Sequence, residues 1–539
     1  MTTDQKPSIP RFVWAIALIS IVVLVSLFLA WLTTGIDSFS VFLSTGVLCL
    51  ALALVCWWTV QKTEGSVLPR ALAGLILLAA VLRLGAGVIW HLTLPILGYN
   101  SPAEQAGYVM ADAYQRDQTA WELAQSEDPL WMSFRNQRSV DQYGGMLFLS
   151  GSLYRYLGGA QHQPLQIALV SSVVSSLAVL FTWVLARRIW GQKIAWLAAW
   201  FLVLFPDALL LGSSQMREAF TVTLVVVAFY GLVGYLQERT WVYLAWMLAA
   251  ILLFIPFSPT FSALLAIMLA LTALFYNLPG LRQSLKSGLL FGKGHVWLVV
   301  ILVVLLVVIS VWFALDQFVP DKISNPISMV NWWIKKSADW QAHLTERASG
   351  KIQAIFDRTP EWSHAYLLLA YGIAQPFLPA ALVVTQAAPI WQGIAIWRAL
   401  GWTILLILLL YASIRAWTKD GDRLTRILIV LVWLAILVAS FRGGGDQWDN
   451  PRYRTTFIGL QVMIAAWGWV KQRDSNDKIF RYIFVWVLLS VLWFIPWYLH
   501  RRIGLPWPVQ DSFKTLALAS VTTILIIIFD MTRNKRLVE

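Results

Sequence analysis

RILIVLVWLAILVASFRGGGDQWDNPRYRTTFIGLQVMIAAWGWV, residues 426–470, contains two apolar stretches joined by a short link with three arginines and two aspartates. Helices of about 20 apolar residues cross the hydrocarbon core of a bilayer. We therefore interpret 426–441 and 455–470 as membrane helices, and the link 442–454 as a polar segment at one face of the membrane.

The composition of the whole chain agrees with this interpretation. Of the 539 residues, 59% are hydrophobic, 13% are charged and 31 are tryptophans, and the mean hydropathy is +0.67. Soluble proteins are far more polar, so the sequence predicts an all-α polytopic membrane protein. The net charge of +13 does not predict a nucleic-acid partner, because the basic residues lie mainly in short links between apolar segments, where they set orientation.

About fourteen apolar segments are long enough to be candidate membrane helices. They lie near 12–33, 40–60, 71–94, 165–186, 193–211, 217–236, 241–256, 260–277, 296–316, 393–414, 426–441, 455–470, 480–498 and 513–531. With both termini in the cytoplasm, the short basic links fall on the cytoplasmic side, except for Arg501 and Arg502. The two cysteines, Cys49 and Cys56, have no histidine or acid at metal-ligand spacing and are expected to be packing residues.

This orientation predicts two long links on the extracytoplasmic side, 98–164 and 317–392. Each contains an amphipathic segment, 144–159 or 363–384, that we expect to be an interfacial or re-entrant helix; a true span at 363–384 is the alternative. Most acids fall on the same side, although the orientation rests on basic residues alone. The predicted parts of the chain are two N-terminal helices (1–66), a core (67–240), further helices (241–316), the second long link (317–392) and the C-terminal helices (393–539).

Three outer segments carry candidate functional residues. The first is ADAYQRDQTAWELA (111–124), where helical spacing puts Asp112 and Arg116 on one face. A carboxylate at a protein–lipid boundary can act as a general base toward a hydroxyl group. The alternative is a surface helix with a structural Asp–Arg pair.

The second segment is FPDALLLGSSQMREAF (205–220), which joins two predicted spans. Arg217 and Glu218 open the following helix, where amide groups and an arginine together can hold an anion. The alternative is an ordinary solvated helix start.

The third segment is the link 442–454. Its glycines 443–445 allow a tight turn or close approach to a ligand. Arginine binds phosphate through two parallel hydrogen bonds and stays charged, so Arg452 and Arg454 predict a site for a lipid phosphate. Arg442 and Tyr453 are further candidates. The alternative is a basic anchor at the membrane interface.

The acids of this link, Asp446 and Asp449, raise the question of a metal. Their oxygens suit a hard divalent cation such as Mg²⁺ or Mn²⁺. Pairing with the neighbouring arginines is the commoner use of such acids, and we favour it. The sequence therefore predicts no cofactor with certainty, and binding of a divalent cation stays an open alternative.

These segments resemble the GT-C superfamily of polyprenyl-phosphate-sugar-dependent glycosyltransferases, which includes protein O-mannosyltransferases and bacterial aminoarabinose transferases. Those enzymes place a catalytic aspartate in the first large outer loop, followed at helical spacing by an aromatic or basic residue, an alanine and a leucine. The matching residues are Asp112, Arg116, Ala120 and Leu123. FPDALLLGSSQMREAF resembles the second outer loop, where Glu218 holds the place of a second acid. The similarity is best over 71–240.

The sequence also departs from the family pattern. Ala113 follows Asp112 where the family has a second acid, and Gly144–Gly145 replaces a proline-rich entry to the interfacial helix. The first departure puts metal use in doubt. The helices at 12–33 and 40–60 are additions before the segment that looks like the family's first span.

The resemblance implies a GT-C-like enzyme of a bacterial cytoplasmic membrane. It would move a sugar from a polyprenyl-phosphate donor to a lipid, glycan or protein acceptor on the extracytoplasmic face, with inversion at the sugar carbon. Asp112 would be the base and Glu218 a second acid; Asp117 is a secondary candidate. The expected phosphate ligands are Arg116, Arg217, Arg442, Arg452 and Arg454. The alternatives are a polymerase or ligase of lipid-linked oligosaccharides, and a transporter or flippase of lipid-linked sugars.

Overall fold

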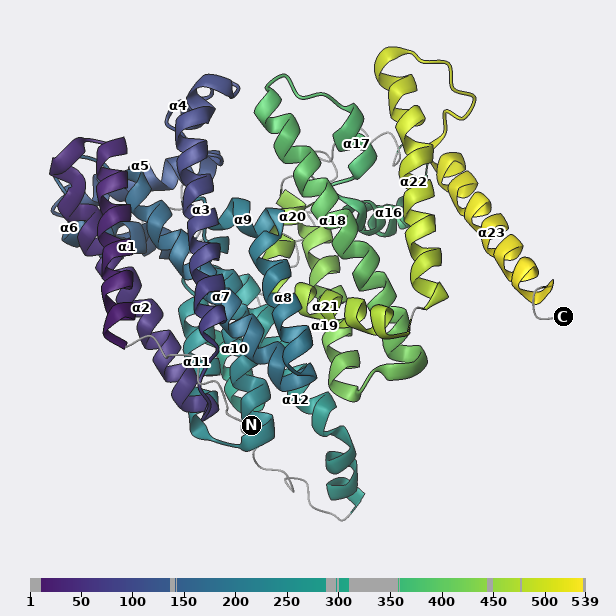
Figure 1. Ribbon diagram of the computed structural model, residues 1–539, viewed down its shortest axis with the longest axis horizontal. Coiled ribbons are helices and arrows are strands. Elements are labelled where there is room, and N and C mark those ends of the chain that lie inside the picture. Colours follow the sequence, from purple (N-terminus) through teal and green to yellow (C-terminus); the bar gives the residue numbers. More distant parts are fainter. Residues whose placement is uncertain are drawn as a thin grey trace, which may run out of the picture.

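The computed structural model describes residues 11–135, 141, 143–286, 297, 300–309, 357, 359–443, 449–475 and 477–536. Within these residues the chain is helical and contains no strand. Most of the long helices run along one common direction and stand side by side (Figure 1). The predicted all-α architecture is confirmed.

Nine helices of the described chain are long and apolar enough to cross a membrane. They are α2 (Phe39–Glu64), α3 (Arg70–Leu97), α7 (Pro164–Trp190), α10 (Glu218–Glu238), α12 (Pro259–Lys286), α18 (Pro389–Arg415), α19 (Arg423–Arg442), α22 (Lys478–Ile503) and α23 (Ser512–Arg536). Each coincides with a predicted span. The protein is therefore an integral membrane protein.

The remaining predicted spans look different in the structure. α1 (Arg11–Leu32), α11 (Trp241–Phe254) and α21 (Ile458–Ser475) are helices at the predicted places but are not among the nine. Only 300–309 of the predicted span 296–316 is described as a continuous helix. The predicted span 193–211 consists of α8 (Gln192–Leu204) and α9 (Pro206–Gly212), bent by 58°. Within the described ranges the count is thus nine, or ten with the bent pair, against about fourteen predicted.

A proline and a buried arginine explain the bend between α8 and α9. In a continuous helix the carbonyl of Leu202 would accept from residue 206, but Pro206 has no N–H group. Nη2 of Arg83, on α3, instead lies 3.4 Å from that carbonyl oxygen. Arg83 is fully buried, and a Cβ atom at Gly212 would lie only 2.7 Å from its side chain. The bend directs the segment after α9 toward the start of α10.

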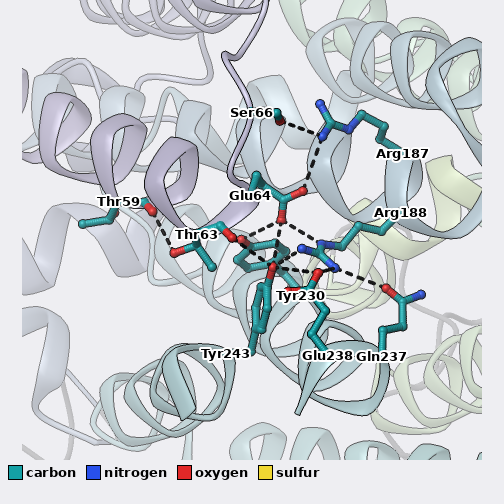
Figure 2. A network of polar contacts seen from close by, with 10 residues as sticks. All are labelled: Thr59, Thr63, Glu64, Ser66, Arg187, Arg188, Tyr230, Gln237, Glu238 and Tyr243. Atoms are coloured by element: carbon teal, nitrogen blue, oxygen red, sulfur yellow. Dashed lines mark hydrogen bonds and ion pairs between the residues drawn. The ribbon is translucent and has the colours of Figure 1, made fainter. Parts of the chain in front are cut away.

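One end of the bundle is held by a buried polar network (Figure 2). Glu64, at the end of α2, accepts from Nε of Arg188 at 2.7 Å and pairs with Arg187 at 3.5 Å. Arg188 also binds Glu238, at the end of α10, at 2.7 Å. The Glu64 side chain is only 3% exposed. Because a buried carboxylate is tolerated when paired and hydrogen-bonded, this network ties the ends of α2, α7 and α10 together.

The short helices gather at the opposite end, which is uppermost in Figure 1. They are α4 (Pro102–Gln105), α5 (Ala111–Gln125), α6 (Gly145–Leu157), α9, α16 (Glu361–Ala374), α17 (Leu378–Val383) and α20 (Asp449–Thr455). Three further short helical segments are η1 (Gly35–Ser38), η2 (Leu130–Phe134) and η3 (Ala416–Asp420). Since α10 has 21 residues, about 30 Å separates Glu218 at this end from Glu238 at the other.

The predicted segment 363–384 falls within α16 and α17. The chain breaks between these helices at Gln375–Pro376, and neither helix is among the candidate spans. The predicted interfacial segment 144–159 contains α6. Whether these helices lie in the interface stays a prediction.

Candidate active site: arginines around Asp112 and Glu218

α5 has an amphipathic sequence that fixes its position over the ends of the long helices. Ala120, Leu123 and Ala124 on its inner face are buried in a cluster with residues of α6, α7 and α10. The opposite face is polar, so one side of α5 packs while the other stays exposed. Asp112 lies in the first turn of α5, next to the start of α10.

The turn before α6 brings a tyrosine to the same place. Gly144 has a left-handed φ of 77°, and a Cβ atom at Gly145 would lie 2.4 Å from the carbonyl oxygen of Pro256. Glycines are therefore needed for this turn and for its close approach to the α11–α12 link. The preceding residue, Tyr143, is buried, with the guanidinium carbon of Arg217 5.2 Å from its ring centre.

Arg452 joins the two acids that the sequence singled out. Its Nε donates to Oε1 of Glu218 at 2.7 Å, and its Nη1 donates to Oδ2 of Asp112 at 3.0 Å. These three residues come from α20, α10 and α5. The segments that contain Asp112, Glu218 and Arg452 thus meet in the structure, and their joint role in one site stays a prediction.

Two further arginines contact this pair of carboxylates, and a third packs nearby. Nη2 of Arg116 donates to Oδ2 of Asp112 at 3.3 Å, and Nε of Arg217 lies 3.6 Å from Oε1 of Glu218. Arg442 packs over the ring of Tyr453 at 4.9 Å. The guanidinium carbon of Arg452 lies 5.9 Å from the centre of the same ring.

Positive charge dominates the electrostatics of this arginine cluster, defined by Arg116, Arg217, Arg442 and Arg452. Burial and the neighbouring guanidinium groups lower the pKa of Arg116 despite the attraction of Asp141 and Asp112. Burial alone would raise the pKa of Tyr143, but Arg442 and Arg217 outweigh it and lower the pKa. A phenol titrates more easily where the local potential is positive.

The carboxylates of Asp112 and Glu218 differ in their exposure to solvent. Burial raises the pKa of Asp112, but Arg452 and Arg116 outweigh that effect and lower the pKa below its ordinary value. Its side chain is 53% exposed, whereas that of Glu218 is 3% exposed. Asp112 is therefore ionised and reachable from outside. Glu218 lies beneath Arg452, and its Oε2 is buried without a hydrogen-bond partner among the described atoms.

Arg454 does not join the arginine cluster. Its Nη1 donates to the carbonyl oxygen of Gln375 at 2.8 Å, and its guanidinium carbon lies 3.1 Å from the ring centre of Trp402. The predicted pairing of Arg454 with Arg452 in one phosphate site is wrong. Both residues lie on helix α20, where side chains two positions apart point in different directions.

Asp117 also lies apart from the cluster, despite being five residues from Asp112 on α5. It accepts hydrogen bonds from the hydroxyl groups of Tyr108 at 2.5 Å and Tyr154 at 2.7 Å, and lies 2.8 Å from Nε2 of His162. Asp117 is 2% exposed. These contacts identify it as a buried structural acid that holds the segment after α6 onto α5.

The predicted acids of the link 442–454 are not placed with the cluster. Asp446 lies outside the described residues, and Asp449 begins α20 with a side chain that is not described. Gly443 ends α19 with an ordinary right-handed φ of −79°. The predicted role of the glycines and of both acids stays a prediction.

A divalent cation does not fit between Asp112 and Glu218 in this arrangement. The space between the two carboxylates is bridged by the guanidinium of Arg452, and each carboxylate contacts a second arginine. A divalent cation there would meet three positive side chains at close range.

Three residues next to the arginine cluster were not predicted from the sequence. Tyr143 packs against Arg217, Thr260 accepts from Nη1 of Arg442 at 3.4 Å, and Asp141 attracts Arg116. Asp141 is held because its Oδ2 accepts from the backbone amide of Leu147 at 3.1 Å. The glycine pair after Tyr143 was the one local signal that could have pointed to it, since a tight turn places the preceding side chain.

Comparisons with known proteins give structural similarities only. No protein-family model matches the sequence, and no curated protein matches it. The chain is similar to ArnT from Cupriavidus metallidurans bound to undecaprenyl phosphate, at 11% identity and a TM-score of 0.41, over 83% of this chain and 75% of that chain. It is also similar to the oligosaccharyltransferase of Archaeoglobus fulgidus tethered with an acceptor peptide, at 13% identity and a TM-score of 0.40.

The second match covers 84% of this chain and 53% of that chain, so this chain spans about half the length of the archaeal enzyme. With identities of 11% and 13% and TM-scores near 0.4, these similarities carry no argument about the activity of this chain.

Proposed function

We propose that this protein is a membrane glycosyltransferase that moves a sugar from a polyprenyl-phosphate donor to an acceptor hydroxyl group. The observation that carries the proposal is a half-exposed carboxylate, Asp112, at the edge of a cluster of three buried arginines and one half-buried arginine, Arg442. That arrangement combines a base with a binding site for an anionic leaving group.

The arginine cluster suits the phosphate of the donor. When the glycosidic bond breaks, negative charge grows on the phosphate, and positive groups already in place favour the transition state over the ground state. Arg452 and Arg217 are both 7% exposed. Their charges are therefore less screened by water than those of surface arginines, which makes them effective for this role.

Asp112 is suited to remove the proton from the acceptor. In the free protein Arg452 and Arg116 hold it ionised. A bound phosphate would share these guanidinium groups, which weakens their pull on Asp112 and makes the carboxylate a stronger base when the donor is present. Glu218, buried beneath Arg452 at 2.7 Å, would position that arginine rather than move a proton.

The location of the site favours a lipid-linked donor. The cluster lies at the end of α10 opposite to the basic residues Arg187 and Arg188, which the positive-inside rule assigns to the cytoplasm. Nucleotide sugars are not expected outside the membrane. A polyprenyl phosphate would supply the sugar, the leaving group and the membrane anchor together.

Donor binding tests this proposal. Wild-type protein in nanodiscs is titrated with a polyprenyl phosphate and with the corresponding polyprenol, which lacks the phosphate. We expect the phosphate to bind at least tenfold more tightly, and Arg452→Met to remove most of this preference. A matched control is Arg239→Met at the opposite end of α10. Equal affinity for phosphate and alcohol in the wild type would contradict the proposal.

Transfer distinguishes this function from a lipid flippase. A flippase moves the donor across the bilayer without breaking the glycosidic bond. Purified protein, radiolabelled polyprenyl-phosphate sugars and a panel of acceptors should yield labelled acceptor and free polyprenyl phosphate in equal amounts. Transbilayer movement of intact donor without release of polyprenyl phosphate would favour the flippase.

A further inference from the structure

An apolar groove lies between the two N-terminal helices and the rest of the bundle. It has a volume of about 340 Å³ and is lined by α1, α2, α3 and α7. α1 packs along α2, and α2 and α3 each pack on α7, which forms the floor of the groove. The groove is separate from the arginine cluster, none of whose residues lines it.

The walls of this groove suit a hydrocarbon chain. The hydroxyl groups in its lining already donate to backbone carbonyls: Ser26 to Val22 at 2.7 Å and Ser176 to Ser172 at 2.6 Å. The third hydroxyl group of the lining, on Ser172, lies 3.4 Å from the carbonyl oxygen of Gly212, to which it donates, and the other lining side chains are apolar apart from Arg70. A molecule bound in the groove would therefore make dispersion contacts but few hydrogen bonds with its walls.

The dimensions suit a single chain lying along the helices. On α3 the lining runs from Arg70 to Leu84, which corresponds to about 21 Å along a helix. The hydrocarbon core of a bilayer is about 30 Å thick, so the groove is longer than one leaflet. An extended acyl chain with its head group at the Arg70 end would lie fully within it.

The positive charge of Arg70 at one end of the groove favours a lipid with an anionic head group. Arg70 is the only charged residue of the lining, it is exposed, and no ion pair is found for it within the described chain. The nearby acid Glu64 is already neutralised by Arg187 and Arg188 (Figure 2). The Arg70 end of the groove therefore carries net positive charge and suits a phosphate head group.

We propose that this groove binds one acyl chain of an anionic glycerophospholipid of the cytoplasmic leaflet, with the lipid phosphate at Arg70. The donor of the proposed transfer reaction is not the occupant, because its phosphate belongs at the arginine cluster, toward the opposite end of the bundle. The bound lipid fills the space between α1–α2 and α3–α7 and so holds the added N-terminal helices against the core.

Native mass spectrometry of the full chain in mixed micelles tests the groove. Phosphatidylglycerol and phosphatidylcholine with identical chains are supplied in equal amounts. We expect one retained phosphatidylglycerol per wild-type chain. Ala53→Phe, which fills the groove from α2, should abolish retention, whereas Ala51→Phe on the exposed face of the same helix should not. Retention of phosphatidylglycerol by Ala53→Phe at the wild-type level would overturn the proposal.

A second pair of variants tests the head-group contact. One arginine near a membrane surface contributes about 1 kcal/mol toward an anionic lipid, so Arg70→Gln should lower the preference for phosphatidylglycerol about fivefold. Lys62→Gln, at the end of α2 and outside the groove lining, should change it less. Equal retention of both lipids by the wild type, or co-purified polyprenyl phosphate in place of phospholipid, would also overturn the proposal. None of these readouts depends on transferase activity.

Discussion

Nε of Arg452 donates to Oε1 of Glu218 at 2.7 Å, although 234 residues separate them in sequence. The same guanidinium donates to Asp112, so one arginine holds two acids from two other parts of the chain. This contact brings together the three segments that the sequence identified as candidates.

Replacing Arg452 by lysine should impair catalysis. A lysine ammonium cannot bridge both carboxylates in the fixed geometry of a guanidinium. We expect kcat/KM for transfer to fall about 10²- to 10³-fold, as when a single stabilising donor is lost from a site. Steady-state kinetics of purified protein check this value.

Arg454→Lys is the matched control for that variant, since Arg454 contacts Trp402 and the Gln375 carbonyl rather than the acids. It should lower the unfolding temperature and leave the donor KM close to wild type. Equal losses of kcat/KM in both variants would mean that the two arginines share one site after all.

We expect Asp117 to stabilise the fold, whereas Asp112 takes part in the reaction. Asp117→Leu leaves the hydroxyl groups of Tyr108 and Tyr154 buried without their acceptor, which costs about 1–3 kcal/mol for each unsatisfied group. We expect a clear drop in unfolding temperature, measured in detergent, with kcat per folded molecule retained. A stable but inactive Asp117→Leu protein would instead place Asp117 in the reaction.

The pH dependence of stability follows from the lowered pKa of Asp112. The ordinary pKa is 3.8, and the arginines lower it in the folded protein. The stabilisation from its ion pairs is therefore present above pH 3.8 and is lost as the pH falls through the lower folded value. On acidification from about pH 5 to about pH 3, the unfolding temperature of Asp112→Asn should fall less than that of the wild type. Identical acid sensitivity would mean that Asp112 does not pair with the arginines.

Transfer should not require a divalent cation. Arg452 occupies the space between Asp112 and Glu218 that a metal would need. Exhaustive treatment with EDTA should leave kcat within about twofold of the untreated enzyme, because a guanidinium bridge is not removed by a chelator. Loss of activity that Mn²⁺ or Mg²⁺ restores would contradict this arrangement of the site.

Apolar length predicted the nine long membrane helices of the described residues, because about 20 apolar residues between polar flanks have few other stable arrangements. The bend at Pro206 was harder to predict, since it depends on Arg83 reaching the Leu202 carbonyl from another helix. A sequence pattern shows that Pro206 breaks the ladder of hydrogen bonds. It does not show which distant side chain satisfies the carbonyl that is left.

The candidate site was likewise predictable from the sequence only in part. Asp112 and Arg116 could be paired from local spacing, because helix geometry fixes which neighbours share a face. Glu218 was a candidate because it opens a helix after a predicted loop. Arg454 was misplaced because two arginines two positions apart in a link look alike until the link forms a helix. Tyr143 and Thr260 were missed because their roles arise from packing between segments far apart in the chain.

Single-turnover transfer by Asp112→Asn tests the central claim most directly. The variant keeps the shape of the side chain but cannot accept a proton, so transfer from a radiolabelled polyprenyl-phosphate sugar should fall about 10²- to 10⁴-fold. Donor binding, measured in parallel, should stay within about threefold of the wild type, and Glu122→Gln, an exposed acid on the same helix, should transfer normally. Unchanged transfer by Asp112→Asn would contradict the account.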